Sequence, residues 1–195
     1  MDERLKKQMD FIREIDKAKS VFRQTYLADG SRRENDAEHS WHLAVMAFLL
    51  AEDASRTVDV LKVVKMVLIH DLVEIDAGDT YAYDPLGNAS KRERELAGAQ
   101  RIFNILPEDQ AKELYDLWEE FEAQESPEAK FAHTLDKCQP VLLNDASGGR
   151  SWREHGVFAG QILERNARTP EGSEKIWEYE KDIIEKNVEK GNIIK

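Results

Sequence analysis

The strongest constraint in this sequence is one long apolar segment with titratable side chains embedded in it. Residues 60–75 read VLKVVKMVLIHDLVEI, and apolar side chains would surround a helix of this sequence on nearly every side. A helix that is apolar all round is expected to be buried. An unpaired charge in such a helix is strongly unfavourable, so His70, Asp71 and Glu74 need compensation. A divalent metal can provide it, and so can a structural His–Asp pair that holds two helices together.

The β-branched residues of the same segment also suit a strand, which would indicate an α/β protein. We predict a helix because the apolar run is too long for a typical strand and no hairpin or βαβ signal flanks it. In a helix, His70 and Glu74 share a face, and Asp71 lies about 100° further round. A metal between these two directions can be bound by an imidazole and a carboxylate.

The rest of the chain has helical periodicity and no convincing period-two alternation, which predicts an all-α fold. The expected start signals are an Asp36 cap, a Thr57 or Asp59 cap, Pro107, and Ser126 followed by Pro127. Pro140 should kink or end its helix. The predicted helices cover 2–18, 37–54, 60–75, 90–105, a stretch from 107 through 121, a stretch from 126, 151–166 and 172–189, with loops at 27–36 and 78–88.

Length and charge limit the classes of protein to which the chain can belong. The 195 residues contain no repeat or linker and predict a single domain over 1–195, with a core at about 15–145 and C-terminal helices over 151–189. The net charge of −11 disfavours a nucleic-acid polymer or an anionic membrane as partner. No apolar run approaches the ~20 residues of a membrane span. Because Cys138 is the only cysteine and the N-terminus has no apolar leader, we expect a cytoplasmic protein.

Two other segments place titratable groups among apolar residues. His39 and His42 are three apart at the start of the helix that follows Asp36, so both or only one can reach a shared site. Asp136 has apolar neighbours and needs a cation, which is either Lys137 or a metal. Taken singly, each of these groups is explained as readily by a structural role as by metal binding.

The combined order His39, His70–Asp71, Asp136 resembles the signature of the HD-domain superfamily of metal-dependent phosphohydrolases, which is His…His-Asp…Asp on three helices. The phrases AEHSWHLAVMA, HDLVEIDAGD and LDKCQP are similar to the 5′-deoxynucleotidase branch and its HD-domain-containing relatives. The resemblance covers about residues 15–145. It implies a helical HD-domain bundle in which the metal ligands are His39, His70, Asp71 and Asp136.

The resemblance also implies roles for residues around the metal. Glu74 and Asp79 match acidic residues that act on the attacking water and the substrate, and Arg23 matches a phosphate-contacting arginine. Gln24 replaces an aromatic residue that often contacts the sugar, so the preference for deoxyribose stays open. Apart from the resemblance, Arg33 precedes the His39 helix and is a candidate phosphate contact, and Lys137 is either a phosphate contact or a partner of the adjacent Asp136.

These residues predict a metal-dependent phosphohydrolase that converts nucleoside 5′-monophosphates, deoxyribonucleotides included, to nucleoside and phosphate through a metal-activated water. The mixed nitrogen and oxygen ligands suit one divalent ion, which can be Mn, Co, Fe, Ni, Zn or Mg. Two alternatives are a hydrolase of nucleoside triphosphates, cyclic nucleotides or alarmones, and a helical dimer that binds a nucleotide without hydrolysing it. The amphipathic C-terminal helices and the resemblance suggest a homodimer.

Overall fold

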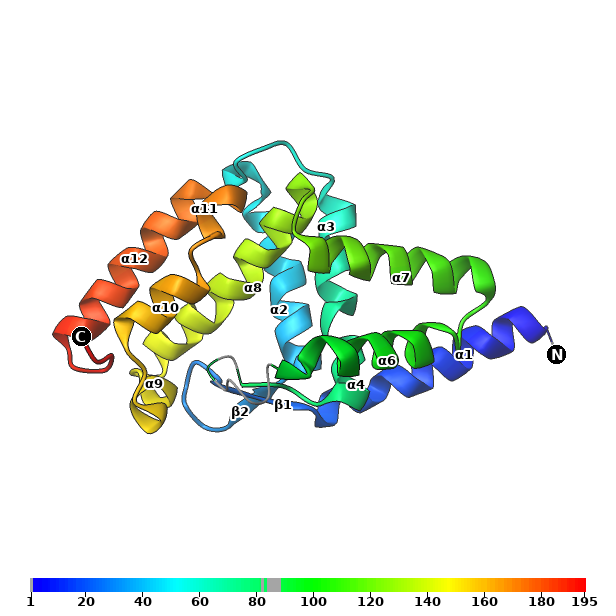
Figure 1. The fold of residues 1–195 in the computed structure, drawn as a ribbon, viewed down its shortest axis with the longest axis horizontal. Helices are drawn as coiled ribbons and strands as arrows, with labels where there is room; N and C mark the ends of the chain where they lie inside the picture. Colours follow the sequence, from blue (N-terminus) through cyan, green and yellow to red (C-terminus); the bar gives the residue numbers. More distant parts are fainter. Residues whose placement is uncertain (1, 82, 84–88) are drawn as a thin grey trace.

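A computed structural model describes residues 2–81, 83 and 89–195, and within these residues it confirms the all-α fold class with one small hairpin (Figure 1). In chain order the elements are α1 (Glu3–Ile15), the 3-10 helix η1 (Asp16–Ser20), β1 (Phe22–Tyr26), β2 (Arg33–Asn35), α2 (Asp36–Leu49), η2 (Ala51–Asp53), α3 (Val60–Ile69), η3 (His70–Val73), α4 (Glu74–Ala77), α6 (Lys91–Phe103), α7 (Glu108–Ala123), α8 (Pro127–Ala146), α9 (Arg150–His155), α10 (Ala159–Arg165), α11 (Thr169–Gly172) and α12 (Glu174–Glu189). Most of the predicted loop at 78–88 lies outside the described residues.

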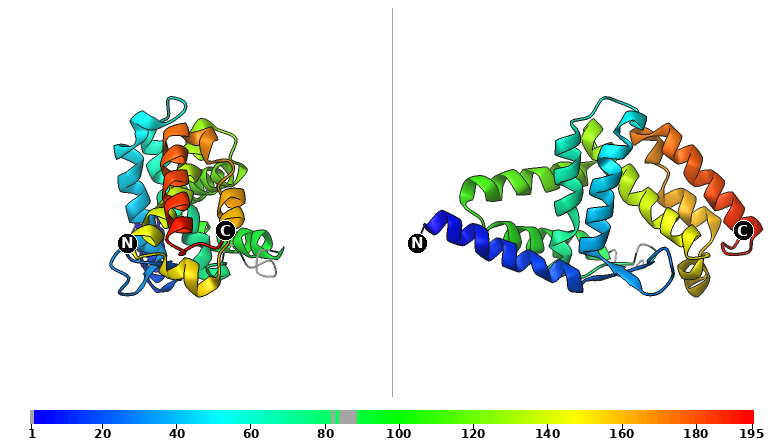
Figure 2. Two further views of the ribbon diagram at one scale, coloured as in Figure 1. Left: turned by 90° about the vertical axis from the view of Figure 1, so that its left-hand side faces the viewer. Right: turned by 180° about the vertical axis from the view of Figure 1, so that it is seen from behind.

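Helix α8 is the element around which the others are arranged. It contacts α2, α3 and α7 on the N-terminal side of the molecule and α11 and α12 on the C-terminal side. Figure 2 shows α2 and α3 side by side when the molecule is seen from behind, with the two termini at opposite ends. None of the described helices is both long enough and apolar enough to cross a membrane.

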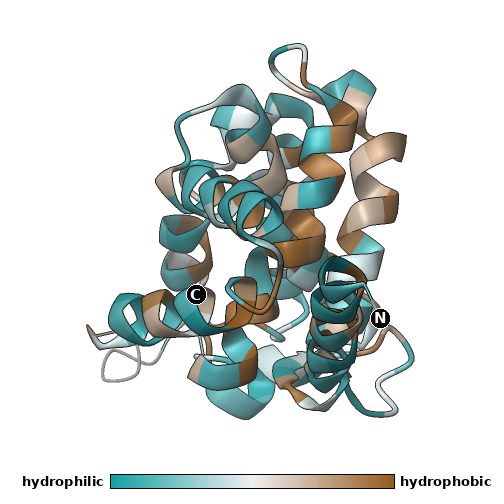
Figure 3. Ribbon diagram, turned by 90° about the vertical axis from the view of Figure 1, so that its right-hand side faces the viewer, coloured by the Kyte–Doolittle hydropathy of each residue, from teal (hydrophilic) through white to brown (hydrophobic). Residues whose placement is uncertain are grey.

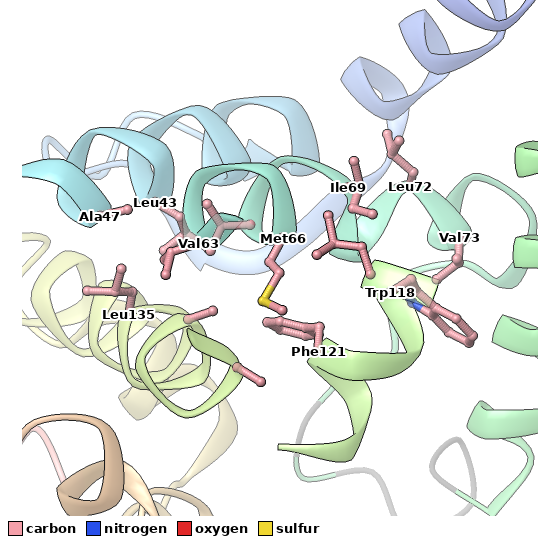
Figure 4. Close-up of a cluster of buried hydrophobic side chains, with 14 of the residues drawn as sticks. Leu43, Ala47, Val63, Met66, Ile69, Leu72, Val73, Trp118, Phe121 and Leu135 are labelled. Carbon is pink, nitrogen blue, oxygen red and sulfur yellow. The ribbon is translucent and has the colours of Figure 1, made fainter. Parts of the chain in front are cut away.

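The buried apolar residues form two clusters that meet at α8. In the larger cluster, Leu43 of α2, Met66 of α3, Phe121 of α7 and Leu135 of α8 pack together (Figure 4). The smaller cluster joins α8 to the C-terminal helices through Val141, Trp152, Ile162, Ile183 and Ile184. The half-buried Leu142 packs against both clusters, which makes α8 common to the two halves of the core.

Most predicted helix starts are confirmed, and one is wrong in an informative way. Asp59 caps α3, and Ser126 caps α8 with Pro127 in its first turn. The cap of α2 is Asn35 and not Asp36, because the side chains of Asn35 and Glu38 bond reciprocally to each other's backbone amides. The Asp36 carboxylate is therefore free of a capping role and is buried, with 1% of the residue exposed.

Four features of the predicted secondary structure need correction. The helix over 60–75 is not continuous, because α3 ends at Ile69 and a 3-10 turn separates it from α4. The loop at 27–36 is largely the turn of an antiparallel hairpin, closed where Leu27 N–H donates to the Arg32 carbonyl oxygen. Pro140 does not end α8, which continues to Ala146. The predicted C-terminal helices are divided, and Gly156 ends α9 with a φ of 59°.

The expectation that α3 is buried all round is also wrong. Val63, Met66 and Val67 are buried, but Leu61 is 65% exposed and Leu68 is 44% exposed. On the neighbouring α2, Trp41, Phe48 and Leu49 are exposed too. Figure 3 shows this helix as a mostly apolar ribbon at the right-hand edge. The two helices thus have buried faces that build the core and outer faces that are still apolar.

Candidate metal centre and substrate pocket

The four signature residues come together although they belong to three separate elements. His39 lies in the first turn of α2, His70 and Asp71 form the start of η3, and Asp136 lies in the middle of α8. Contacts of α8 with α2 and α3 bring these elements side by side. The 3-10 turn tightens the backbone at the His-Asp pair, as often occurs at functional positions within a helix.

The facing atoms of this group lie close together in a buried space. Nε2 of His39 is 3.1 Å from Oδ1 of Asp136. Nε2 of His70 is 3.1 Å from Oδ2 of Asp71 and 3.7 Å from Oδ1 of Asp136. His39 is fully buried and His70 is 5% exposed. Ligand atoms of His39, His70 and Asp136 all lie within 4.8 Å of one another.

These residues fit a divalent metal ion. Nε2 of His70 is buried and makes no hydrogen bond to any residue that the structure describes, although it faces two carboxylates, so the atom is available as a ligand. Its other nitrogen, Nδ1, donates to the Val67 carbonyl oxygen at 2.9 Å, which directs Nε2 toward the shared space. Two imidazoles and two carboxylates are a donor set typical of first-row divalent metals.

A second group of acidic residues adjoins the first. Ligand atoms of Asp36, Asp71 and Glu74 also lie within 4.8 Å of one another. Among the described residues, both carboxylate oxygens of Asp36 and Oε2 of Glu74 are buried without a hydrogen-bond partner. Asp71 belongs to this second group and lies 3.1 Å from His70 of the first, so the residues that could hold a metal ion extend beyond the four signature residues.

The ring nitrogen of His39 that does not face Asp136 is hydrogen-bonded to a buried side chain that the sequence analysis did not identify. Its Nδ1–H donates to Oε1 of Gln139 at 3.1 Å, and Nε2 of Gln139 in turn donates to Glu34 at 2.8 Å. Gln139 is fully buried and Glu34 is 1% exposed. Gln139 lies three residues after Asp136 on α8, so helical spacing from a suspected ligand was the available signal.

Arg23 of β1 places a guanidinium among these carboxylates. It donates to Oδ2 of Asp71 at 2.6 Å and lies 3.6 Å from Asp36 and 3.9 Å from Asp136. Burial opposes its charge, but the carboxylates around it outweigh this effect and raise the pKa of Arg23 further. The unpredicted hairpin therefore has a clear function, because it carries this arginine into the site.

The pKa shifts of the group show strong mutual dependence. Burial works against the charge of His70, but Asp71 and Asp136 raise the pKa of His70 to about 10. Burial also opposes ionisation of Asp71, yet His70 and Arg23 lower its pKa. Glu74 differs, because burial and the Asp71 charge together raise its pKa well above the ordinary value. Burial and Asp71 likewise raise the pKa of Asp36 to about 8.

A cavity of about 280 Å³ opens beside this group. Its lining includes most of the side chains that the sequence marked for substrate or catalysis, namely Arg23, Gln24, Asp71, Glu74, Asp79, Asp136 and Lys137. Lys137 lies 3.3 Å from Oδ2 of Asp136, and burial lowers the pKa of Lys137 to about 8. The volume is near the lower end of the range for small-molecule sites, which is about 300–1,000 Å³.

The structure does not bring every predicted residue to the cavity. Arg33 lies on β2 outside the lining, with its guanidinium carbon 5.9 Å from the centre of the Tyr26 ring. His42 approaches Nε2 of Gln139 at 3.3 Å but is not in either metal-binding group. The cavity also has lining residues that are not among the predicted site residues: Lys91, Asn144, Ser151, Trp152, Ile162, Arg165 and Asn166.

Comparison with known proteins places this geometry in context. The chain is 36% identical over 135 residues to the 5′-deoxynucleotidase HDDC2 of Homo sapiens, covering 69% of this chain and 65% of the relative. It is 30% identical over 137 residues to the 5′-deoxynucleotidase YBR242W of Saccharomyces cerevisiae, covering 68% and 56%. The match therefore spans less than two thirds of the length of each of these curated relatives.

A solved structure is similar over nearly the whole chain. The crystal structure of a predicted metal-dependent phosphohydrolase from Magnetospirillum magnetotacticum MS-1 has a TM-score of 0.94 and 48% identity, covering 98% of this chain and 96% of that one. The HD domain family matches residues 15–177, a range that contains all four signature residues and the cavity around them. This chain therefore belongs to the HD domain family.

Proposed function

We propose that this protein is a metal-dependent phosphohydrolase that removes phosphate from nucleoside 5′-monophosphates, deoxyribonucleotides included. The observation that carries the proposal is the convergence of the signature residues at a cavity that Arg23, Glu74 and Asp79 also line. The printed names of the human and yeast relatives support the substrate class, and that of the bacterial structure supports the chemistry.

The charge of the cavity favours a phosphomonoester over a more highly charged substrate. Its described lining has four basic side chains (Arg23, Lys91, Lys137 and Arg165) and four acidic ones (Asp71, Glu74, Asp79 and Asp136). With all eight side chains ionised, a state that a bound cation favours for the carboxylic acids, these charges balance, and a divalent ion would then add an excess of two positive charges. A phosphomonoester carries about −1.5 to −2 at neutral pH, which matches this excess.

We propose that His39, His70, Asp71 and Asp136 hold one divalent metal ion, with Mn, Co, Fe, Ni, Zn and Mg as the candidates. When bound, such an ion would act as a Lewis acid toward the phosphoryl group and would lower the pKa of a coordinated water. Asp36 and Glu74 offer ligands for a second ion, so the measured metal content decides between one and two.

The remaining side chains have separate roles in this proposal. Arg23 turns its guanidinium from the carboxylates to the phosphate oxygens, where its planar fork can donate two hydrogen bonds. Oε2 of Glu74 has no hydrogen-bond partner among the residues that the structure describes. A divalent ion beside Glu74 would offset the burial and the Asp71 charge that raise its pKa, and the ionised carboxylate would then orient the attacking water and accept its proton. Asp79 binds a substrate hydroxyl or protonates the leaving oxygen, and Lys137 contacts the phosphate.

The test is phosphate release from a panel of ribo- and deoxyribonucleoside 5′-monophosphates, with metal-stripped protein and with each metal restored. We expect metal-dependent release that Asp71→Asn abolishes. Asp76→Asn is the matched control, because Asp76 is five residues away and pairs with Arg101 outside the cavity. Absence of release from every monophosphate with every metal would exclude the proposed nucleotidase activity. Release from triphosphates or cyclic nucleotides instead would assign the protein to the alternative class of nucleotide hydrolases.

The same panel addresses the choice of sugar. Gln24 lines the cavity where family members often have an aromatic residue, and an amide can hydrogen-bond to a 2′-hydroxyl. We propose that ribonucleotides are accepted beside deoxyribonucleotides, and Gln24→Trp should then favour the deoxy series. If the ratio of activity on ribonucleotides to activity on deoxyribonucleotides is the same in the wild type and this variant, Gln24 does not determine the sugar preference.

We also propose a cytoplasmic homodimer. The exposed apolar faces of α2 and α3 support self-association, because contiguous apolar surface on a protein often marks an interface. The single buried cysteine is consistent with a reducing compartment.

A further inference from the structure

The cavity extends away from the metal-binding group along α8. Asp136, Pro140 and Asn144 line it at intervals of four residues, so they share one face of this helix. At 1.5 Å per residue, the eight residues from Asp136 to Asn144 correspond to about 12 Å along the axis. A phosphate held near Asp136 therefore leaves the far end of the cavity to the part of the substrate most distant from phosphorus. In a nucleoside monophosphate that part is the base.

The amide oxygen of Asn144 lacks a hydrogen-bond partner among the described residues. Asn144 is 7% exposed, and this oxygen, Oδ1, is buried. Buried polar atoms in folded proteins are nearly always paired. Because Asn144 is a lining residue of the cavity, rotation of its amide toward the cavity would let a ligand supply the missing hydrogen bond. An amide presents a donor beside an acceptor, which complements the edge of a nucleobase.

The surroundings of Asn144 are suited to a planar, mostly apolar group. Trp152 of α9 and Ile162 of α10 line the same cavity and are 4% and 2% exposed. Both belong to the smaller hydrophobic cluster, so their positions are fixed by packing against α8 and α12. Asn166 also lines the cavity, and its amide is held by a 2.9 Å hydrogen bond to Glu180. The far end is thus rigid, and the C-terminal helices build it.

We propose that Asn144 is a specificity-determining residue that hydrogen-bonds to the base of the nucleotide, with Trp152 and Ile162 forming the apolar walls of the base site. This inference rests on the proposed nucleotidase function and adds the part of the substrate that the C-terminal helices recognise. It assigns base selection to α8, α9 and α10 and leaves the phosphate to the metal-binding end.

The test compares substrates with and without a base. We would measure kcat/KM for the four deoxyribonucleoside 5′-monophosphates and for deoxyribose 5-phosphate, using the wild type, Asn144→Ala and Asn144→Asp. In Asn144→Ala we expect a loss on the order of 10- to 100-fold for the preferred nucleotide, in KM more than in kcat. The rate with deoxyribose 5-phosphate should not change. Asn144→Asp keeps an acceptor but loses the donor, so it should reorder the preference among bases.

Asn104→Ala is the matched control, because Asn104 is an exposed asparagine at the end of α6, outside the cavity. An equal loss on nucleotides and on deoxyribose 5-phosphate in Asn144→Ala would overturn the proposal, and so would no loss on either. If the wild type hydrolyses no monophosphate, the function proposal fails by itself. In that case we would measure binding of the same ligands to metal-loaded protein by calorimetry. The base contact is supported if a nucleotide binds more tightly than deoxyribose 5-phosphate and if Asn144→Ala abolishes this difference. Any other result rejects the base contact.

Discussion

Gln139 is not one of the proposed metal ligands, but it contacts one of them directly. It accepts a hydrogen bond from His39 and donates one to Glu34, which fixes the orientation of the imidazole. We expect Gln139→Met, which keeps the volume of the side chain, to weaken metal binding by about 10- to 100-fold. Titration with a chelating indicator would measure this. The exposed Gln100→Met is the control, and equal metal affinity in the two variants would assign Gln139 a packing role alone.

Glu180 predicts a pH dependence of stability. The residue is fully buried on α12, and burial raises the pKa of Glu180 to about 7 from an ordinary 4.5. Its protonated form therefore stabilises the fold fully below pH 4.5, and this contribution is lost as the pH rises through 7. The loss is on the order of 3 kcal/mol. Between pH 5 and pH 8, the urea concentration at the midpoint of unfolding should therefore fall less in Glu180→Gln than in the wild type.

The exposed Glu185→Gln, on the same helix, controls for the change of charge. Because other buried groups titrate in this range, the informative quantity is the difference between the variant and the wild type at each pH. Parallel curves for the Glu180 variant and the wild type would mean that Glu180 does not titrate as described.

The contact of α6 with the 3-10 turn η3 sets the position of the segment that carries Asp71 and Glu74. A Cβ atom on Gly98 would lie 2.6 Å from the carbonyl oxygen of Val73, which directly precedes Glu74. We expect Gly98→Ala to destabilise the protein by roughly 1–3 kcal/mol and to reduce turnover, because η3 must shift. Gly160→Ala in α10 meets nothing within 4 Å and should be neutral or stabilising by up to about 1 kcal/mol. Equal melting temperatures of the two variants would contradict this reading.

Elements with strong local signals could be predicted from the sequence, and those set by tertiary contacts could not. The start of α8 followed from Ser126 and Pro127, whose capping roles depend only on their neighbours. The hairpin that carries Arg23 has one very short strand, β2, and no alternating pattern. The division of helix 60–75 was hidden because its sequence has no glycine or proline at that point. Helical spacing likewise did not predict that Asn144 would line a cavity.

The fold of the whole chain supports the prediction of one domain, which we propose for residues 1–195. Leu142 packs against both hydrophobic clusters, so neither half of the core is separate from α8. At this scale the exposed apolar residues matter most. Trp41 and Phe48 lie two turns apart on α2, and Leu61 and Leu68 do so on α3. Helices α2 and α3 are in contact, so these exposed apolar residues lie on neighbouring helices.

Self-association through this surface predicts a specific response to substitution. Phe48 is 58% exposed, so Phe48→Glu should convert a dimer to a monomer in light scattering without loss of helix content. Tyr179→Glu changes an equally exposed residue on α12 and should leave the dimer intact. A monomeric wild type would remove the homodimer proposal, and dissociation by the α12 variant alone would place the interface on the C-terminal helices.

Because the proposed metal ligand and the proposed base-contacting residue lie on one continuous helix, relatives of this chain can diverge only in certain ways. Asp136 and Asn144 are both on α8, so their separation and relative direction are fixed by its geometry. Insertion of one residue between them would rotate the second by about 100°. Substitution at position 144, or replacement of the helices that face it, leaves the metal end untouched. Relatives that descend from such a chain can therefore exchange amino acids along this stretch of α8. A change in the length of the stretch would misalign the proposed base site with the proposed metal site.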